Sequence, residues 1–474
     1  MTVTSIPGGS QGLSTSEDLR QQFAGALLEP GAPGYDEARR VANGRFVKRP
    51  ALIARCTGTK DVQAALAYAR ANGLQVAVRC GSHSTAGFSS TDGGIVIDVG
   101  PMKASLVDAS ARTGRFGAGM TWADLDAATQ EHGLAVTGGR VSDTGVTGLT
   151  LGSGSGWLER ALGPTADSLL SAEVVTASGE VVRAGAGGDP ELLWGLAGGG
   201  GNFGVVTELE FRLHPVGPIV FAGLILHPRS VGGELMRFYR DFMNQAPEEV
   251  GGGLALITAP PAPFVPEEVR LKLVCALIVV YTGDPADGPA ALAPLLRWRE
   301  PLVSMVQPMP YTALQKMLDE GNPFGIREYA KVDYLRELPD PAIDAMLDEA
   351  ARVSSPMTTI VLCPGGGALS RRDPSAVSLV FPDVPWFYQC ISAWPDVLQP
   401  DEPHIAWTRG FMEAMRPWAL DEAPVNFIAV DEPESRLRRS FGEEKFARLT
   451  ALKDRYDPAN VFALNQNIPP SGHS

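Results

Sequence analysis

Short apolar segments alternate with amphipathic helical patterns along the first 215 residues of the chain. The pattern predicts a strand over Leu52 to Cys56, a helix over Lys60 to Asn72 that ends at Gly73, and a second strand over Leu74 to Val78. Another apolar run, at residues 94–99, follows closely. This rhythm is typical of an α/β or α+β domain.

The pattern changes near residue 216, where the glycine-rich loops stop and longer amphipathic segments begin. Helices are predicted over residues 231–244, 289–298, 342–353 and 408–415. Strands are predicted over residues 254–257, 271–281, 357–362 and 387–392. The last segment contains a predicted strand over 425–429 and a helix over 443–455. We therefore expect one domain at 1–215, a second at 216–424 and a C-terminal segment at 425–474.

Composition indicates which binding partners and which cellular compartment to expect. The chain has 474 residues, 44% of them hydrophobic, and a net charge of −14 without a dense basic block. A polyanion would be repelled overall, so neither nucleic acid nor a membrane is expected as a partner. The five cysteines are scattered and the six histidines form no HxH or HxxxH pair, so the sequence predicts neither a disulfide framework nor a metal site. No secretory signal pattern and no long apolar run is present, so a cytoplasmic location is expected. The sequence does not indicate an oligomeric state.

The first stretch whose residues could bind a ligand or take part in a reaction is the loop that follows the strand ending at Val78. It reads Arg79-Cys80-Gly81-Ser82-His83-Ser84, with one histidine among small residues. Neighbouring backbone N–H groups in such a turn can bind a phosphate, and Arg79 would add positive charge. The loop is therefore either a pyrophosphate site or a surface turn with a solvated histidine.

Glycine is concentrated again between Gly139 and Trp157. So many glycines cost chain entropy, a cost that is tolerated where a backbone bends sharply or lies against a flat ligand. A flexible surface loop is the alternative. The run lacks the Gly-x-Ser-x-Gly pattern of a hydrolase nucleophile, which argues against acyl transfer.

A third glycine cluster, residues 199–204, formally satisfies the GxGxxG pattern of dinucleotide-binding folds. That pattern requires a strand before the glycines and a helix after them. Here a helix is predicted over Pro190 to Leu196 and a strand over residues 205–211, which is the reverse order. A Rossmann site is therefore not predicted.

Taken together, these segments resemble the berberine-bridge-enzyme-like oxidases of the vanillyl-alcohol-oxidase group. Residues 78–89 are similar to the family's flavin-attachment loop, Arg-x-Gly-Gly-His, in which the histidine is bonded covalently to FAD; Ser82 replaces the second glycine. Residues 139–157, the Gly-Asn-Phe-Gly-Val-Val-Thr segment ending at 207, and the tail 453–470 resemble further family signatures. The resemblance implies an α+β, two-domain PCMH-type FAD-binding fold. It also implies an inserted α+β substrate domain built on an antiparallel sheet, and a C-terminal segment that returns to the FAD domain.

The resemblance also implies the cofactor and its contacts. FAD would be attached through His83 alone, because Val141 stands where doubly attached relatives have a cysteine. The implied cofactor-binding residues are Arg79, Cys80, Gly81, Ser82, His83, Ser84, Gly87, Phe88, Thr137, Ser142, Asp143, Thr144, Gly145, Thr147, Gly148, Gly152, Val206, Asn465 and Asn467. Thr144 departs from the Val or Leu of the family's oxygen-access gate, so the choice between O2 and another electron acceptor stays open.

The implied function is an FAD-dependent oxidase that removes a hydride from a C–H next to an alcohol or amine of a small molecule, such as a secondary metabolite, sugar or alkaloid. O2 would be the acceptor and hydrogen peroxide a product. A flavin dehydrogenase with another acceptor and a non-catalytic flavin-binding protein are the alternatives.

The catalytic base is not where the family usually has it. Pro424 occupies the position of the family's tyrosine, so Tyr388, Tyr329 or a carboxylate is expected to serve instead. Tyr388 lies on one face of a predicted strand with Trp386, Cys390, Ser392 and Trp394. That face is either a pocket floor or ordinary sheet packing.

Overall fold

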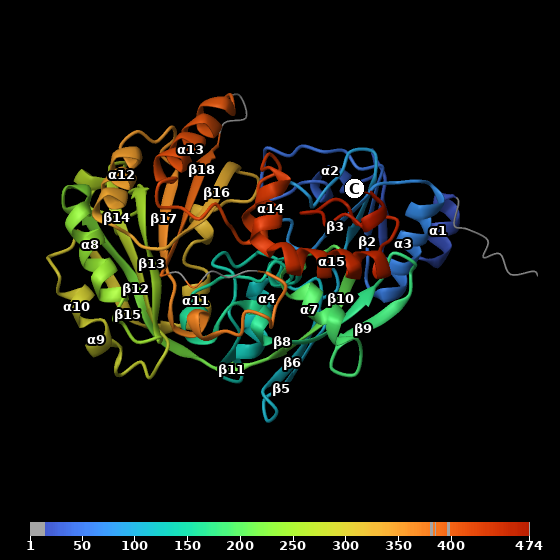
Figure 1. Cartoon of the computed structure of the whole chain (residues 1–474), viewed down its shortest axis with the longest axis horizontal. Helices are drawn as coiled ribbons and strands as arrows, with labels where there is room; N and C mark the ends of the chain where they lie inside the picture. Colours follow the sequence, from blue (N-terminus) through green and yellow to red (C-terminus); the bar gives the residue numbers. More distant parts are fainter. Residues whose placement is uncertain (1–14, 380–382, 384, 396–398, 474) are drawn as a thin grey trace, which may run out of the picture.

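A computed structural model describes residues 15–379, 383, 385–395 and 399–473 of the chain. Two lobes lie side by side (Figure 1). One contains the first half of the described chain together with its C-terminal helices, and the other contains the middle of the chain. The expected α+β fold is confirmed.

A small sheet with parallel strands opens the first lobe. Its strand order is β1 (Ala26–Leu28), β2 (Leu52–Arg55), β4 (Ile95–Asp98) and β3 (Val76–Arg79), with β2, β4 and β3 parallel. Parallel neighbours need a crossover connection, and α3 (Thr59–Ala71) provides it between β2 and β3. The short helix α1 (Ser16–Gln22) precedes β1, and the short helix α2 (Tyr35–Ala38) lies between β1 and β2 in sequence.

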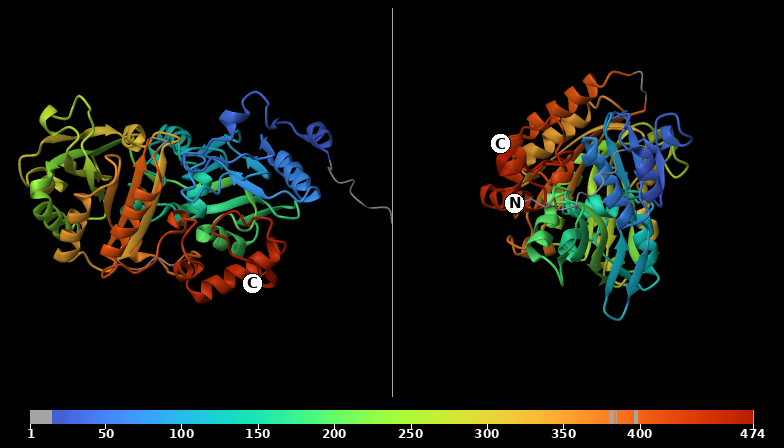
Figure 2. Two further views of the ribbon diagram at one scale, coloured as in Figure 1. Left: turned by 90° about the horizontal axis from the view of Figure 1, so that it is seen from above. Right: turned by 90° about the vertical axis from the view of Figure 1, so that its right-hand side faces the viewer.

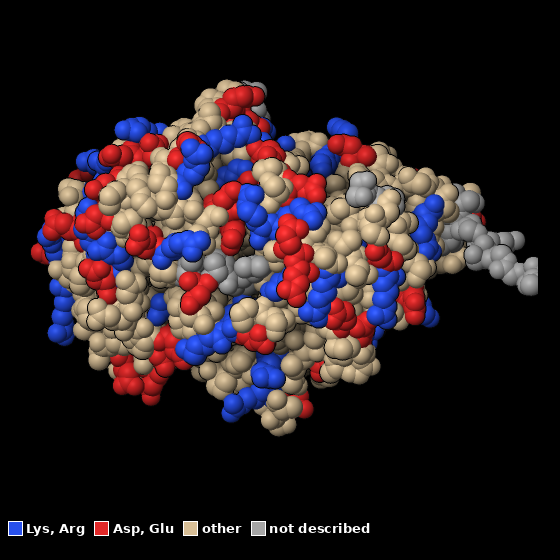
Figure 3. All heavy atoms as spheres, in the orientation of Figure 1, with Lys and Arg blue, Asp and Glu red and all other residues tan. Residues whose placement is uncertain are grey.

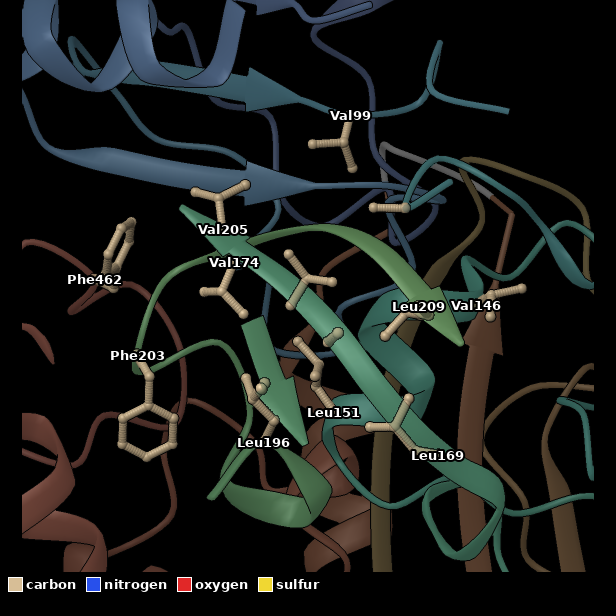
Figure 4. Close-up of a cluster of buried hydrophobic side chains, with 14 of the residues drawn as sticks. Val99, Val146, Leu151, Leu169, Val174, Leu196, Phe203, Val205, Leu209 and Phe462 are labelled. Atoms are coloured by element: carbon tan, nitrogen blue, oxygen red, sulfur yellow. The ribbon is translucent and has the colours of Figure 1, made fainter. Parts of the chain in front are cut away.

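An antiparallel sheet of five strands forms the rest of this lobe. Its order is β5 (Ser105–Asp108), β6 (Thr113–Gly117), β10 (Val205–Arg212), β8 (Leu169–Val175) and β9 (Val181–Gly185). Helices α4 (Trp122–Gln130), α5 (Val146–Leu151), α6 (Glu159–Leu162) and α7 (Pro190–Gly199) connect its strands, and the short pair β7 (Leu134–Ala135) and β11 (His214–Pro215) closes it. Figure 4 shows part of the core of this lobe, in which Val174 and Leu209 from the strands belong to one buried cluster with Leu151, Leu196 and Phe462.

A seven-stranded antiparallel sheet organises the second lobe. Its order is β15 (Val303–Pro310), β12 (Ile219–Pro228), β14 (Leu273–Tyr281), β13 (Val250–Thr258), β17 (Thr359–Pro364), β18 (Trp386–Trp394) and β16 (Arg327–Leu335). Helices α8 (Gly232–Met243), α12 (Asp340–Ala350) and α13 (Glu402–Met415) share one hydrophobic core with this sheet. The short helices α9 (Gly288–Ala291), α10 (Ala293–Leu296) and α11 (Tyr311–Gln315) complete the lobe.

The other face of the same sheet is turned toward the first lobe. Val332, Tyr334, Cys363 and Phe387 belong to the core of the first lobe, whereas Leu335, Trp386 and Tyr388 belong to the core under the helices. Neighbouring residues of a strand alternate between the two faces of a sheet. This division therefore shows, for each residue of β16 and β18, which of the two faces its side chain lies on.

The C-terminal helices α14 (Glu434–Phe441) and α15 (Glu443–Tyr456) lie against the first lobe, as both views in Figure 2 show. Leu449 and Leu452 of α15 are buried in that lobe's core. The chain thus returns to its starting lobe after building the second one.

Some local predictions were wrong. Residues 425–429 were expected to form a strand but begin with a 3-10 turn at Val425–Phe427, where the side chain of Asn426 donates to Leu149 O in helix α5. The helix expected over 289–298 is divided into α9 and α10, since Pro294 cannot continue the helix. Strands β12 and β15 and helix α5 were not predicted.

Acidic and basic side chains are interspersed over the face drawn in Figure 3, so the charge of −14 does not gather there in one patch. Among the described residues, no helix combines the length and the apolar character that crossing a bilayer requires.

Candidate active site

The loop after β3 is held in an unusual backbone conformation. Ser82 has φ 64°, in the left-handed region that favours glycine. Gly81, just before it, lies directly against the backbone of the glycine-rich run, because a Cβ atom there would come within 2.3 Å of the Gly145 nitrogen and 2.7 Å of the Asp143 oxygen. The absence of a side chain at Gly81 therefore allows the two loops to touch.

This contact brings Asp143 to His83. Nε2 of His83 lies 2.8 Å from Oδ1 of Asp143, although the carboxylate is off the N–H direction, so the pair makes a close polar contact and not a regular hydrogen bond. The interaction with the imidazole lowers the pKa of the Asp143 carboxyl. The Phe324 ring packs edge-on against the imidazole, with centroids 6.5 Å apart. His83 is thus fixed in place by groups from two lobes.

Glu328 reaches the same place from β16. It lies on the sheet face turned toward the first lobe, opposite its neighbour Tyr329. Desolvation raises the pKa of this carboxyl, against the opposing influence of the His83 and Arg45 charges. Asn43 holds the strand there, because its Nδ2 donates to Glu328 O (3.0 Å) and its Oδ1 accepts from Glu328 N (3.2 Å). From the sequence, no role was assigned to Glu328. The alternation of side chains along a strand could have indicated that Glu328 and Tyr329 lie on opposite faces of the sheet.

The glycine-rich run is more regular than expected. Part of it forms α5, and Nδ2 of Asn426 donates to Leu149 O at the carboxyl end of that helix (3.0 Å). Gly152 leaves room for this amide, because a Cβ atom there would lie 2.0 Å from Oδ1 of Asn426. The link between a glycine at 152 and an amide 274 positions later in the chain has no signal in the sequence.

The terminal segment is joined to the third glycine cluster by Asn202. Its Nδ2 donates to Gln466 O (3.2 Å), and its Oδ1 accepts from Ile468 N (3.0 Å). Helix α7 precedes this cluster and β10 follows it, which confirms that the order is the reverse of a Rossmann site. Oδ1 of Asn465 and Oδ1 of Asn467 are buried without a hydrogen-bond partner among the described residues.

Comparison with known proteins finds two family models that match parts of the chain. A model described as an FAD binding domain matches residues 50–185, and one described as berberine and berberine like matches residues 423–469. An FAD-linked oxidoreductase of Dictyostelium discoideum is 29% identical over 452 residues, which cover 92% of this chain and 93% of the relative. The chain therefore contains an FAD binding domain and a berberine and berberine like segment, and it is similar to an FAD-linked oxidoreductase over nearly its whole length.

The chain is similar to nicotine oxidases both in sequence and in fold. (R)-6-hydroxynicotine oxidase of Paenarthrobacter nicotinovorans is 36% identical over 228 residues, covering 48% of this chain and 50% of the relative. The crystal structure of 6-hydroxy-D-nicotine oxidase from Arthrobacter nicotinovorans superposes with a TM-score of 0.85 at 25% identity, covering 95% of this chain and 98% of that one. The predicted PCMH-type fold, the family and the enzyme class are therefore confirmed, and the cofactor is FAD.

The residues present fit an FAD molecule. A cavity of about 500 Å³ borders the His83 loop and is lined by Arg79, Cys80 and Ser82 among others. Nη1 of Arg79 is buried without a partner while its Nη2 donates to Asp98 (2.9 Å), so a donor remains for an anionic group. The unpartnered amide oxygens of Asn465 and Asn467 are acceptors for N–H or hydroxyl groups.

Several predicted contacts are already engaged within the protein. The hydroxyls of Thr137, Ser142 and Thr147 donate to Gly163 O, to Asp319 and to Ala118 O, respectively. These three side chains hold the loops in shape, and their hydroxyl protons are already used within the protein. Val206 is buried in β10.

The remaining predicted residues fall into the same two loops. Oγ of Ser84 accepts from Phe88 N (3.1 Å), and Gly87, with φ 74°, closes that turn against the Phe46 ring. Thr144 N donates to Val141 O and its carbonyl accepts from Trp122 N, while Gly148 faces open space within α5.

The two tyrosines expected as catalytic groups are not brought to His83. Tyr388 is fully buried in the core under the helices, where its ring packs edge-on against Phe411 at 5.7 Å. Tyr329 lies on the same side of the sheet and donates its hydroxyl to Asp431 (2.7 Å). The alternation of side chains along β16 and β18 places both tyrosines on the sheet face opposite to that of Glu328.

Proposed function

We propose that this oxidoreductase carries FAD bound covalently through His83 and uses O2 to oxidise a C–H group next to an alcohol or amine of a small molecule. The arrangement of His83 supports the proposal best. Its imidazole stands at the end of a phosphate-type loop, in contact with the glycine-rich run and beside the lobe that would hold the substrate. We also propose that the domains divide at 1–215, 216–424 and 425–474, and that the five free cysteines reflect a reducing cytoplasm.

Bound FAD supplies the hydride acceptor. The protein's part is to bind the substrate, to exclude water and to take the hydroxyl or amine proton. Glu328 suits that last role in place of the missing tyrosine, because it faces the first lobe beside His83 and its raised pKa makes it a stronger base than an exposed glutamate. A Glu328→Gln variant should keep its FAD but lose about 10²- to 10⁴-fold in kcat/KM.

Acid precipitation tests the covalent bond. We expect the wild-type protein to stay yellow after denaturation, with the flavin on the peptide that contains His83. His83→Ala should release all of its flavin under the same treatment, whereas His132→Ala, an exchange at an exposed histidine, should retain it. Flavin on any other peptide would contradict the assignment.

Substrate and acceptor are tested together. The relative named for 6-hydroxynicotine suggests cyclic amines as a first set, and sugars, oligosaccharides and other secondary metabolites form the second. Anaerobic bleaching of the flavin band by a compound identifies it as a substrate and rules out a non-catalytic binding protein. Release of stoichiometric peroxide in air is expected for an oxidase. Slow reoxidation of the reduced flavin in air, together with fast electron transfer to an artificial dye, would indicate a dehydrogenase. The threonine at position 144 would then be linked to the choice of electron acceptor.

A further inference from the structure

The contact between His83 and Asp143 has a chemical consequence for cofactor attachment. A neutral imidazole carries its proton on one ring nitrogen and a lone pair on the other. A carboxylate 2.8 Å from Nε2 stabilises the form that has the proton on Nε2. The lone pair then resides on Nδ1, which accepts no hydrogen bond from any described residue.

We propose that Asp143 is a positioning residue for flavin attachment, which holds His83 as the Nε2–H tautomer and so directs the covalent bond to Nδ1. The inference rests on the covalent attachment proposed above. It adds a role for a specific side chain and a specific ring atom.

The position of Asp143 does not depend on its own side chain alone. Backbone contact between Gly81 and Gly145 joins the two loops on either side of the pair. On the far side, Asp319 accepts from Ser142 N (2.9 Å) and from its hydroxyl (2.6 Å), which anchors the loop to the second lobe. Trp122 N donates to Thr144 O on the other side of the aspartate (3.1 Å). The carboxylate is therefore held at the imidazole by anchors at both neighbouring residues.

The bond-forming step balances with the acceptor already proposed. Nδ1 forms a bond to the methyl carbon at position 8 of the flavin, and one C–H bond of that methyl breaks. The proton from the methyl, the proton from Nε2 and an electron pair end on the flavin, which is thereby reduced by two electrons. O2 takes up two electrons and two protons as hydrogen peroxide and restores the oxidised flavin. Asp143 offsets the positive charge that develops on the imidazole as Nδ1 forms its bond.

Glu328 is a second acidic group that interacts with His83, and it belongs to β16 and not to the glycine-rich run. The variant Glu328→Gln is a matched comparison for Asp143→Asn, because it removes a nearby carboxylate but leaves the contact between Nε2 of His83 and Asp143 unchanged. A distant control is Glu131→Gln, an exposed glutamate at the end of α4.

The test is the rate and position of flavin attachment in the full chain. Protein produced without riboflavin is mixed with FAD, and covalent incorporation is followed by the fluorescence of acid-washed protein. We expect Asp143→Asn to slow incorporation by at least about tenfold, as is common when the partner that orients a histidine is removed. Asp143→Glu should recover part of the rate, and Glu131→Gln should match the wild type.

The attachment atom is determined by NMR of the isolated flavin peptide. We expect Nδ1 alone in the wild type and in Glu328→Gln, and a mixture of Nδ1 and Nε2 in Asp143→Asn. Wild-type attachment through Nε2, or an Asp143→Asn variant with wild-type rate and position, overturns the proposal. A wild-type protein that never retains flavin covalently would instead refute the attachment at His83. Non-covalent FAD affinity and circular dichroism of each variant separate slow attachment from failed folding, and Asp143→Glu decides the matter if Asp143→Asn does not bind FAD.

Discussion

Ser82 places a side chain at a backbone position that favours glycine. Its φ of 64° costs an L-amino acid about 1 to 2 kcal/mol. The loop nevertheless adopts this conformation, because Ser82 O accepts from Ala42 N (3.1 Å) and the adjacent Gly81 packs on the Gly145 backbone. Backbone strain is thus stored beside the residue that we propose to carry the flavin.

Replacement of Ser82 tests this strain. Glycine removes the penalty but adds about 0.4 to 1 kcal/mol of entropy to the unfolded chain, so Ser82→Gly should leave the free energy of unfolding unchanged or raise it by up to about 1 kcal/mol. Ser82→Val should lower it by about 1 to 2 kcal/mol or more, because a β-branched residue tolerates positive φ poorly. Urea denaturation of both variants and of Ser82→Ala provides the measurement. A glycine variant clearly less stable than Ser82→Ala would contradict the argument.

At the scale of elements, α15 connects the terminal segment to the first lobe through a buried ion pair. Nζ of Lys453 donates to Asp457 (2.7 Å), Asn202 O (2.9 Å) and Phe462 O (3.1 Å), and both charged groups are fully buried. Asp457 also accepts from the backbone N–H groups of Val461 and Phe462. The pair therefore shapes the chain that leads to Asn465 and Asn467.

Lys453→Met should lower the free energy of unfolding by about 3 to 5 kcal/mol, because it leaves the Asp457 carboxylate buried without its countercharge. We expect weaker non-covalent binding of FAD as well, since residues 461–468 lose their anchor. The same exchange at exposed Lys60 should change stability by no more than about 0.5 kcal/mol.

The double variant Lys453→Met/Asp457→Asn should be more stable than Lys453→Met, because it no longer buries an unpaired charge. Thermal denaturation and fluorescence titration with FAD measure both effects. If the double variant proves less stable than the single one, the ion pair is not the source of the loss.

At the scale of the whole molecule, polar contacts join the two lobes near the site. Gln315 of α11 donates to Oδ2 of Asp126 on α4 (2.9 Å), and Arg160 of α6 donates to Gly365 O (2.6 Å) and Ala246 O (3.0 Å). Asp126 is 1% exposed and its Oδ1 has no partner among the described residues. Burial raises the pKa of Asp126 to about 7.

This shift makes the contact between the lobes depend on pH. The folded protein keeps the Asp126 proton up to about pH 7, whereas the unfolded chain releases it near 3.8. The contribution of Asp126 to stability is therefore greatest at low pH, falls as pH rises from about 4 to about 7, and stays low above 7.

Asp126→Asn should remove the loss of stability that the ionisation of Asp126 causes as pH rises. At pH 8 we expect the variant to be more stable than the wild type by up to about 4 kcal/mol, and at pH 4 the two should be nearly equal. Denaturation curves of both proteins from pH 4 to 8 give the difference between their free energies of unfolding at each pH. The titration of other groups is common to both proteins and cancels in this difference. A difference that does not change with pH would show that Asp126 is ionised in the folded protein throughout this range.

The sequence by itself determined the features that depend on neighbours along the chain. Helices α3 and α15 lie where their amphipathic patterns placed them, and the reversed order around residues 199–204 ruled out a Rossmann site. The resemblance of the glycine-rich segments to a known family then carried the fold, the cofactor and the class of reaction. Local periodicity and turn chemistry are encoded within a few residues, which is why these predictions succeeded.

Only the tertiary structure decided which side chains meet. Glu328 and Tyr329 are adjacent in sequence, yet the order of strands in the seven-stranded sheet turns the first toward His83 and the second toward Asp431. Asp143 reaches His83 only because two glycines, 64 residues apart, let their backbones touch. The face that a strand buries and the loop that lies against another are set by packing between distant segments, and no local pattern of residues contains that information.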